Sequence, residues 1–257
     1  MTEPVHYALT GSVATLTMDQ PESRNALGPQ MLQALVQALR TAAADEAVRV
    51  VVLTGSGSTF CSGADLRGGP AGAAFAGSGP GLLVEVLREL LDHPKPTIAR
   101  VQGHVAGGGN GLVAACDMAV AVASARFAFS EVRLGVSPAV VAVACLRVMA
   151  PRDAAELMLT GERIWAERAR TAGLLTAVVE PGALDATVTS WAQLLGLGAP
   201  GAVAATKQLL RTVPTLGREE AFAWTAELSA RLFAGPEAAE GIEAFMARRP
   251  PSWASPG

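Results

Sequence analysis

The stretch GHVAGGGNG, from Gly103 to Gly111, links a short apolar run to a helical pattern that continues to Cys116. The apolar run, Thr97–Val101, follows a proline and predicts a strand. Consecutive glycines let a backbone turn sharply and let another group approach it closely. The first amides of a helix lack partners and lie at the positive end of its dipole, so this segment suits a negative charge. A tight turn with no binding role is the competing interpretation.

The glycines do not form either common nucleotide-binding loop. The pattern GxxxxGK[ST] is missing, and the triple glycine lacks the GxGxxG spacing with an acidic residue about twenty positions later. We therefore look for another anion-stabilising role.

A second glycine-containing stretch, TFCSGADL from Thr59 to Leu66, also follows a predicted strand. The preceding run, Val48–Thr54, is continuous and β-branched, as expected of a strand buried on both faces. The chain thus has two glycine-rich exits from strands. Residues 67–81 follow the second stretch and are rich in Gly, Ala and Pro. They could form a lid over a ligand or a plain surface connection.

Strand and helix patterns alternate through the first 199 residues, which predicts an α/β fold. A hairpin around Gly11 comes first, and Pro29–Ala44 carries apolar residues at helical spacing. From about Pro200 onward the pattern is helical only. We therefore expect a core over residues 1–199 and a helical region over 200–257, which would pack on the core or on another subunit.

Composition excludes several classes of function. The chain has 257 residues, a net charge of −3 and no long basic block, so a nucleic-acid surface is not expected. Its apolar runs are short and its first residues lack a signal-peptide pattern, so we expect no membrane span and a cytoplasmic location. The three cysteines and three histidines show no metal-binding spacing. We expect free thiols and no metal site.

Several short motifs occur together and in order. They are RNAL from Arg24, FCSGADL, GHVAGGGNGLVAACD, FAFSEVRLGVSP, LTGERIWAERARTAGLLTAVV and the ending AEGIEAFMARRPPSW. Over essentially its whole length the chain resembles the enoyl-CoA hydratase/isomerase (crotonase) family. The resemblance implies a spiral of ββα units with a helical C-terminal region that forms homotrimers or hexamers. It also implies an acyl-CoA thioester as the substrate, with no cofactor beyond the CoA that the substrate carries.

The resemblance assigns the catalytic groups by their positions in the motifs. The amides of Ala64 and Gly108 would bind the thioester carbonyl oxygen, where enolate charge develops. Hydratases of the family usually place two glutamates over the reacting carbons. Glu131 stands at one of these positions, and Gly111 stands at the other. The competing interpretation of Glu131 is a surface residue paired with Arg133.

The missing glutamate leaves several activities open. The motifs look most like methylglutaconyl-CoA or related branched enoyl-CoA hydratases, so we favour a hydratase. A Δ3-Δ2 isomerase could work with the single Glu131 and is the next alternative. A CoA-thioester-binding protein without catalysis, and other enolate chemistry such as decarboxylation or thioester hydrolysis, are further alternatives.

The family also suggests which residues contact the substrate and its CoA. Arg24 is a candidate for the phosphates, although a solvated loop arginine fits equally well. Asn110 could orient a water, but a contact with its own backbone is favoured. We expect Asp65 and Asp117 to brace turns and His104 to pack. The complete set of candidate substrate-binding and CoA-binding residues is Arg24, Ala26, Ser62, Gly63, Asp65, Leu66, Gly107, Asn110, Gly111, Phe245 and Arg248.

Overall fold

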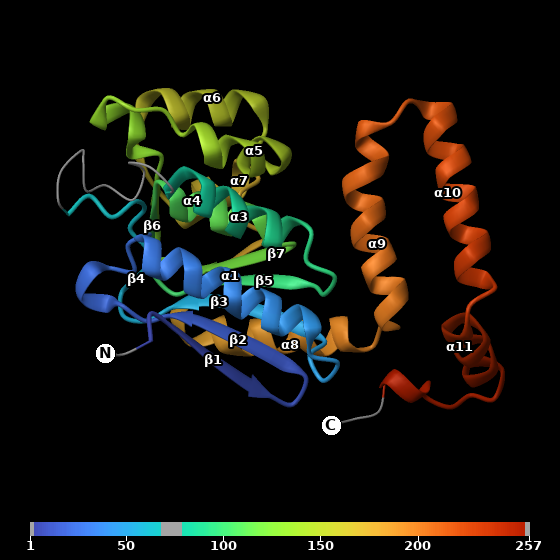
Figure 1. Cartoon of the computed structure of the whole chain (residues 1–257). Helices are drawn as coiled ribbons and strands as arrows, with labels where there is room; N and C mark the ends of the chain where they lie inside the picture. The colour runs from blue at the N-terminus through green and yellow to red at the C-terminus, as the bar shows by residue number, and fades with distance from the viewer. Residues whose placement is uncertain (1–2, 68–78, 255–257) are drawn as a thin grey trace.

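A computed structural model describes residues 3–67 and 79–254 of the chain (Figure 1). Its main sheet has six strands in the order β1-β2-β3-β5-β7-β10. The first two strands form the predicted antiparallel hairpin, and the remaining neighbours are parallel. The strands are β1 (Val5–Thr10), β2 (Val13–Met18), β3 (Val50–Gly55), β5 (Thr97–Val101), β7 (Met118–Val122) and β10 (Ala177–Val179).

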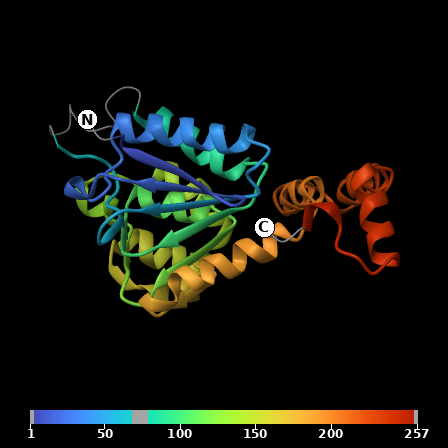
Figure 2. The ribbon, with the colours of Figure 1, turned by 90° about the horizontal axis from the view of Figure 1, so that it is seen from below.

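The main sheet is buried between helices. Every residue of β3 is buried, as its continuous apolar sequence predicts. Helix α1 (Pro29–Ala44) and helix α8 (Leu184–Gly196) lie on opposite sides of the sheet (Figure 2). The buried residues of α1, among them Leu32, Leu35 and Leu39, recur every three or four positions. The core therefore lies in two layers around this sheet.

A second, smaller sheet has the order β4-β6-β8-β9. Its strands are β4 (Thr59–Cys61), β6 (His104–Ala106), β8 (Arg126–Ala128) and β9 (Arg163–Trp165). Each of β4, β6 and β8 comes a few residues after a strand of the main sheet and leads toward a helix. The helices that follow are α3 (Gly79–Leu91), α4 (Gly108–Ala115) and α5 (Ala139–Val148). This repetition of strand, strand and helix confirms the predicted spiral of ββα units.

The C-terminal helices extend away from the two sheets (Figure 1). They are α9 (Pro200–Thr212), α10 (Arg218–Phe233) and α11 (Pro236–Met246), while α6 (Pro151–Thr160) and α7 (Ala166–Thr171) belong to the core. Large apolar side chains on α10 and α11 are exposed to solvent, with Phe245 at 81 %. Within the described residues, no helix is both long and apolar enough to cross a membrane.

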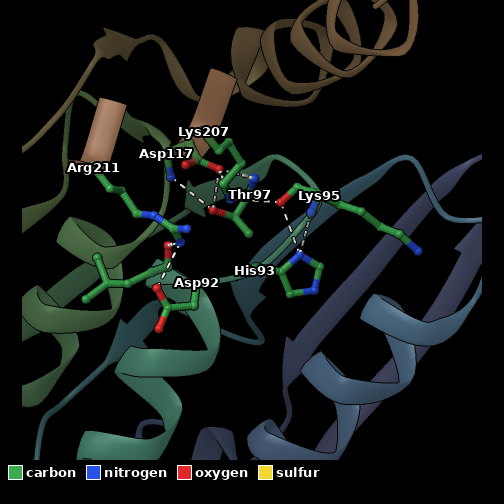
Figure 3. Close-up of polar contacts among 8 residues, drawn as sticks. Asp92, His93, Lys95, Thr97, Asp117, Lys207 and Arg211 are labelled. Atoms are coloured by element: carbon green, nitrogen blue, oxygen red, sulfur yellow. Dashed lines mark hydrogen bonds and ion pairs between the residues drawn. The ribbon is translucent and has the colours of Figure 1, made fainter. Parts of the chain in front are cut away.

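Helix α9 is fixed to the core by a buried lysine (Figure 3). Lys207 is 6 % exposed, forms an ion pair of 2.6 Å with Asp117, and donates to the Lys95 carbonyl at 2.9 Å. The same Asp117 oxygen accepts hydrogen bonds from the amide and hydroxyl of Thr97, at 2.7 and 3.0 Å. Asp117 thus braces this end of β5, as expected. One helical turn later, Arg211 pairs with Asp92 at 2.9 Å.

His93 joins the end of α1 to the start of β5. Its Nδ1 accepts the Lys95 amide at 3.1 Å, so the ring proton lies on Nε2, which donates to the Leu39 carbonyl at 3.2 Å. Burial lowers the pKa of His93, and the nearby charges of Lys207 and Lys95 lower it further. Burial therefore favours the neutral imidazole, although hydrogen bonds to the carbonyls of Lys95 and Leu39 raise its pKa part of the way back.

We expect the free energy of unfolding to fall as pH drops below about 6.5, the ordinary pKa of histidine. Unfolded His93 binds a proton there, whereas folded His93 takes it up only at lower pH. The slope that His93 adds is at most roughly 1.4 kcal/mol per pH unit. Urea titrations of wild type and His93→Gln from pH 5 to 8 measure it. Equal slopes for the two proteins would contradict the assignment.

Candidate active site

The two predicted glycine-rich exits meet at the carboxyl ends of β4 and β6. Gly63 and Gly107 both have positive φ, at 88° and 49°, which favours glycine. A Cβ atom on Gly63 would lie 3.0 Å from the Ala106 carbonyl oxygen and 3.3 Å from the Gly107 Cα. The two backbones thus pack directly on each other, because neither carries a side chain at the contact.

The other two glycines of the triple are required by neighbouring side chains. A Cβ atom on Gly108 would approach Leu27 Cδ1 to 2.8 Å, and one on Gly109 would approach Cys61 Cβ to 2.8 Å. The backbone of α4 therefore begins in close contact with both strand exits. The burial of Cys61 that results raises the pKa of its thiol to about 12. That thiol is not suited to act as a nucleophile.

The amides of Ala64 and Gly108 are available as donors. Ala64 forms a short parallel β-bridge with Leu27. The hydrogen bonds of this bridge join Leu27 to the Gly63 carbonyl and to the Asp65 amide, and they do not use the Ala64 amide. Gly108 is the first residue of α4, where an amide has no acceptor in its own helix. Across residues 3–67 and 79–254, neither amide donates a hydrogen bond. Ala64 and Gly108 directly follow Gly63 and Gly107, whose backbones are in contact, so the two amides lie at the same glycine turns.

Asn110 holds this arrangement from beneath. Its Nδ2 donates to the Ala128 carbonyl at 2.8 Å and to the Gly107 carbonyl at 3.2 Å. Ala128 also accepts the Gly107 amide, at 3.0 Å. The favoured prediction, that Asn110 contacts backbone, is confirmed. Its Oδ1 is buried and has no partner among the described residues.

Glu131 lies at the start of a 3-10 turn, Ser130–Leu134, directly after β8. Its Oε1 lies 3.5 Å from the position of a Cβ on Gly107, so the carboxylate faces the glycine turn. Its Oε2 is buried without a partner in the described part of the chain. Burial raises the pKa of this carboxyl. Arg133 Nε donates to the Thr160 carbonyl at 3.0 Å, and among the described residues no ion pair joins Arg133 to Glu131, so the alternative of a surface pair is wrong.

The position of the second glutamate is filled by the neighbouring helix. A Cβ atom on Gly111 would lie 2.6 Å from Val141 Cγ1 and 2.9 Å from its Cβ. Val141 lies on α5 and is 3 % exposed. Close packing of α4 on α5 therefore leaves no space for a side chain at Gly111, and Glu131 is the carboxylate that faces the Gly107 turn.

Gly111→Glu is expected to lower the free energy of unfolding by about 1–3 kcal/mol, because it overpacks the α4–α5 contact. Combining it with Val141→Ala should recover part of the loss. Gly182→Glu serves as the control, since a Cβ there meets nothing within 4 Å. Urea unfolding of the three variants measures the effect. A Gly111→Glu variant as stable as wild type would contradict the prediction, because it would show that α5 moves to accommodate the side chain at little cost.

The enoyl-CoA hydratase/isomerase family model matches residues 9–256. This chain belongs to the enoyl-CoA hydratase/isomerase family. The (E)-benzylidenesuccinyl-CoA hydratase of Thauera aromatica is 32 % identical over 97 % of this chain and 98 % of its own. The carnitinyl-CoA dehydratase of Salmonella arizonae is 34 % identical over 98 % and 99 %. A crystal structure of enoyl-CoA hydratase from Mycobacterium smegmatis matches with a TM-score of 0.91 at 35 % identity, over 98 % and 99 %.

Several residues predicted from the family motifs lie beside the glycine turns. The Ser62 amide donates to the Arg24 carbonyl at 3.0 Å, and the Ala26 side chain is buried in the same loop. Asp65 accepts the Arg67 amide at 3.0 Å and pairs with its guanidinium at 2.7 Å, so it braces its turn as expected. Leu66 is exposed. Residues 67–81, for which the sequence leaves both a lid and a plain surface connection open, lie largely outside the described residues.

Other residues predicted from the family motifs do not lie at the glycine turns. Phe245 and Arg248 lie on and after α11, which the structure does not bring to the glycine turns of its own chain (Figure 1). His104 is exposed on β6 and lies outside the core, although its Nδ1 accepts the Arg126 amide of β8 at 3.2 Å. Val141, which fills the glutamate position, could not be predicted from the sequence. Only the crossing of α4 and α5 reveals that contact.

Proposed function

We propose that this chain is an enoyl-CoA hydratase, which adds water across the C2–C3 double bond of a 2-enoyl-CoA thioester. The observation that carries the proposal is the Glu131 carboxylate, which faces the glycine turn beside two available amides and whose Oε2 has no partner among the described residues. A buried carboxyl with a raised pKa is suited to transfer protons near neutral pH. The membership of the family supports a CoA thioester as the substrate.

In the proposed mechanism, the amides of Ala64 and Gly108 donate to the thioester carbonyl. Water attacks C3 while Glu131 takes its proton, and the electron pair of the double bond moves to the carbonyl oxygen as an enolate. Glu131 then returns the proton to C2, so that one water is added in total. Each preorganised donor lowers the barrier by about 3 kcal/mol in well-studied cases.

A Δ3-Δ2 isomerase is the second candidate, and the close contact of Gly111 with Val141 favours it. With one carboxylate, Glu131 could remove a proton from C2 of a 3-enoyl thioester and return it at C4. The same two amides would stabilise the intermediate enolate. Hydration remains our first choice because relatives of this chain carry the names of a hydratase and a dehydratase.

The acyl group that we propose is branched or substituted, such as methylglutaconyl. Two relatives are named for substituted acyl groups, benzylidenesuccinyl and carnitinyl. The substrate and its CoA would lie along the loops that contain Arg24, Ser62 and Asp65. No other cofactor is needed for this chemistry, and no group of three metal-binding side chains occurs among the described residues.

We also propose that the C-terminal helices join subunits into a homotrimer or hexamer. Their exposed apolar side chains form a surface that a monomer would leave in water. Phe245 and Arg248 would then reach the CoA bound by a neighbouring subunit. The apolar residues concerned are Phe222, Phe233, Ile242, Phe245 and Met246. The cytoplasmic location stays a prediction, which the free, buried Cys61, Cys116 and Cys145 support.

Product analysis of the purified protein tests the function. Crotonyl-CoA, 3-methylglutaconyl-CoA and a 3-enoyl-CoA are each offered to wild type and to Glu131→Ala. A 3-hydroxyacyl-CoA that disappears with the variant supports a hydratase with one glutamate.

The other outcomes are equally distinct. Conversion of the 3-enoyl thioester to the 2-enoyl thioester alone would make the enzyme an isomerase. Release of free acid or carbon dioxide would indicate hydrolysis or decarboxylation. If both proteins bind CoA thioesters without turnover, the hydratase proposal is wrong and a binding role replaces it.

A further inference from the structure

A hollow of about 190 Å³ lies on the small sheet, beside the candidate active site. The central residues of two of its strands, Phe60 and Phe127, are buried in the core. Their neighbours alternate to the other face and line the hollow. The polar side chains of this lining include Arg24, Ser62, His104, Arg126, Ser130 and Arg163.

The hollow carries uncompensated positive charge. Three arginines and one histidine line it, and its lining contains no carboxylate. Considering residues 3–67 and 79–254, none of Arg24, Arg126 and Arg163 forms an ion pair. Arginines elsewhere, such as Arg168 and Arg249, each pair with two carboxylates. A chain with a net charge of −3 thus keeps three unpaired guanidiniums together.

Two of the basic side chains, Arg126 and His104, are held by neighbouring residues. The Arg126 guanidinium lies over the Trp165 ring, 3.9 Å from its centroid. His104 Nδ1 accepts the Arg126 amide at 3.2 Å, so the neutral ring carries its proton on Nε2, which has no acceptor among residues 3–67 and 79–254. Burial lowers the pKa of His104, and the charges of Arg163 and Arg126 lower it further. Arg126 and Arg163 line the same hollow as this imidazole.

We propose that this hollow binds a phosphate group through Arg24, His104, Arg126 and Arg163. Guanidinium groups match phosphate oxygens in geometry and remain charged at every physiological pH. Three guanidinium groups match the charge of a phosphate dianion better than the single charge of a carboxylate ligand. Only the source of the phosphate rests on the proposed function, since acyl-CoA carries phosphates at its adenosine end. A small free phosphate compound is the other source.

The position of the hollow gives the bound phosphate a role. Ser62, Ala106 and Ser130 line it, and each precedes a residue of the candidate active site. Gly63 and Gly107 form the touching turns, and Glu131 is the carboxylate. A phosphate bound here therefore contacts the segments that position both the donors and the carboxylate.

Direct binding tests the site without reference to turnover. Isothermal titration of 3′,5′-ADP and of inorganic phosphate is compared for wild type, Arg126→Met, Arg163→Met and the double variant. Each substitution is expected to weaken binding about tenfold, because it removes a charge-assisted hydrogen bond. Wild-type binding should also weaken with added salt. Arg152→Met is the control, an exposed arginine outside the hollow.

Kinetics then separate the two sources. If the phosphate belongs to the substrate, the double variant raises the KM for crotonyl-CoA but leaves that for crotonyl-pantetheine unchanged. If it is a free compound, phosphate binding weakens while both KM values stay as in wild type. A protein that binds 3′,5′-ADP in this way but turns over no thioester supports the site and disproves the proposed function.

Two results would overturn the site. The first is equal binding of 3′,5′-ADP by wild type and the double variant. The second is a change in molar mass in light scattering, which would mean that the arginines pair with carboxylates of another subunit. Circular dichroism checks the fold of each variant. If the double variant is unfolded, the binding of 3′,5′-ADP by Arg163→Met decides between the outcomes. Arg163→Lys is then expected to recover part of the affinity.

Discussion

Glu131→Gln is expected to lower kcat by about 10²–10⁴-fold, the usual contribution of a positioned general acid–base group. Glutamine preserves the shape of the side chain but can neither accept nor return the proton of water. The variant should still fold, because Oε2 has no partner that would be lost among the described residues. Its melting temperature is expected at or above that of wild type, since a buried carboxylate without a partner is costly.

The control for this variant is Glu180→Gln, which alters an exposed glutamate outside the site. Stopped assays with crotonyl-CoA and thermal unfolding provide the two measurements. Loss of activity together with a lower melting temperature would point to a structural role for Glu131 instead.

The pH dependence of the wild type gives a second measure of Glu131. Burial raises the pKa of its carboxyl, and only the ionised form can take the proton of water. We therefore expect kcat/KM to fall as pH decreases through a pKa above the ordinary 4.5 of glutamate. A profile that stays flat down to pH 4.5 would contradict a role as base.

Asp117→Asn is expected to lower the free energy of unfolding by about 3 kcal/mol, the largest stability effect that we predict. It leaves the ammonium of Lys207 buried beside the Lys95 carbonyl without a negative partner. Burial already lowers the pKa of Lys207, and Asp117 raises it part of the way back. Without Asp117, the lysine must either remain charged at high cost or lose its proton.

The reverse substitution should cost less. Lys207→Met removes the buried charge and leaves Asp117, whose side chain retains 31 % exposure and keeps both hydrogen bonds from Thr97. We expect a loss of about 1 kcal/mol. Urea unfolding at one protein concentration compares these variants with Gln208→Met, an exposed position on the same helix. Equal losses for the two partners would disprove the asymmetry.

Much of the fold could be predicted from local patterns. The continuous apolar sequence of Val50–Gly55 and the spacing of apolar residues in α1 predict a strand and a helix without other information. The short strands of the small sheet could not be predicted in this way. Each has three residues, which is too few for a pattern of alternation to emerge. Their partners lie far away in the sequence.

The sequence by itself determined the longer strands and helices of the core, the helical C-terminal region, the two glycine-rich segments and the presence of Glu131 without a second glutamate. These features lie within short segments, where neighbouring residues decide the outcome. Tertiary structure alone decided that Gly63 touches Gly107, that Val141 fills the space beside Gly111, and that the basic side chains on the small sheet gather in one hollow. These contacts join residues on separate turns of the spiral, so they exist only once the turns have packed together.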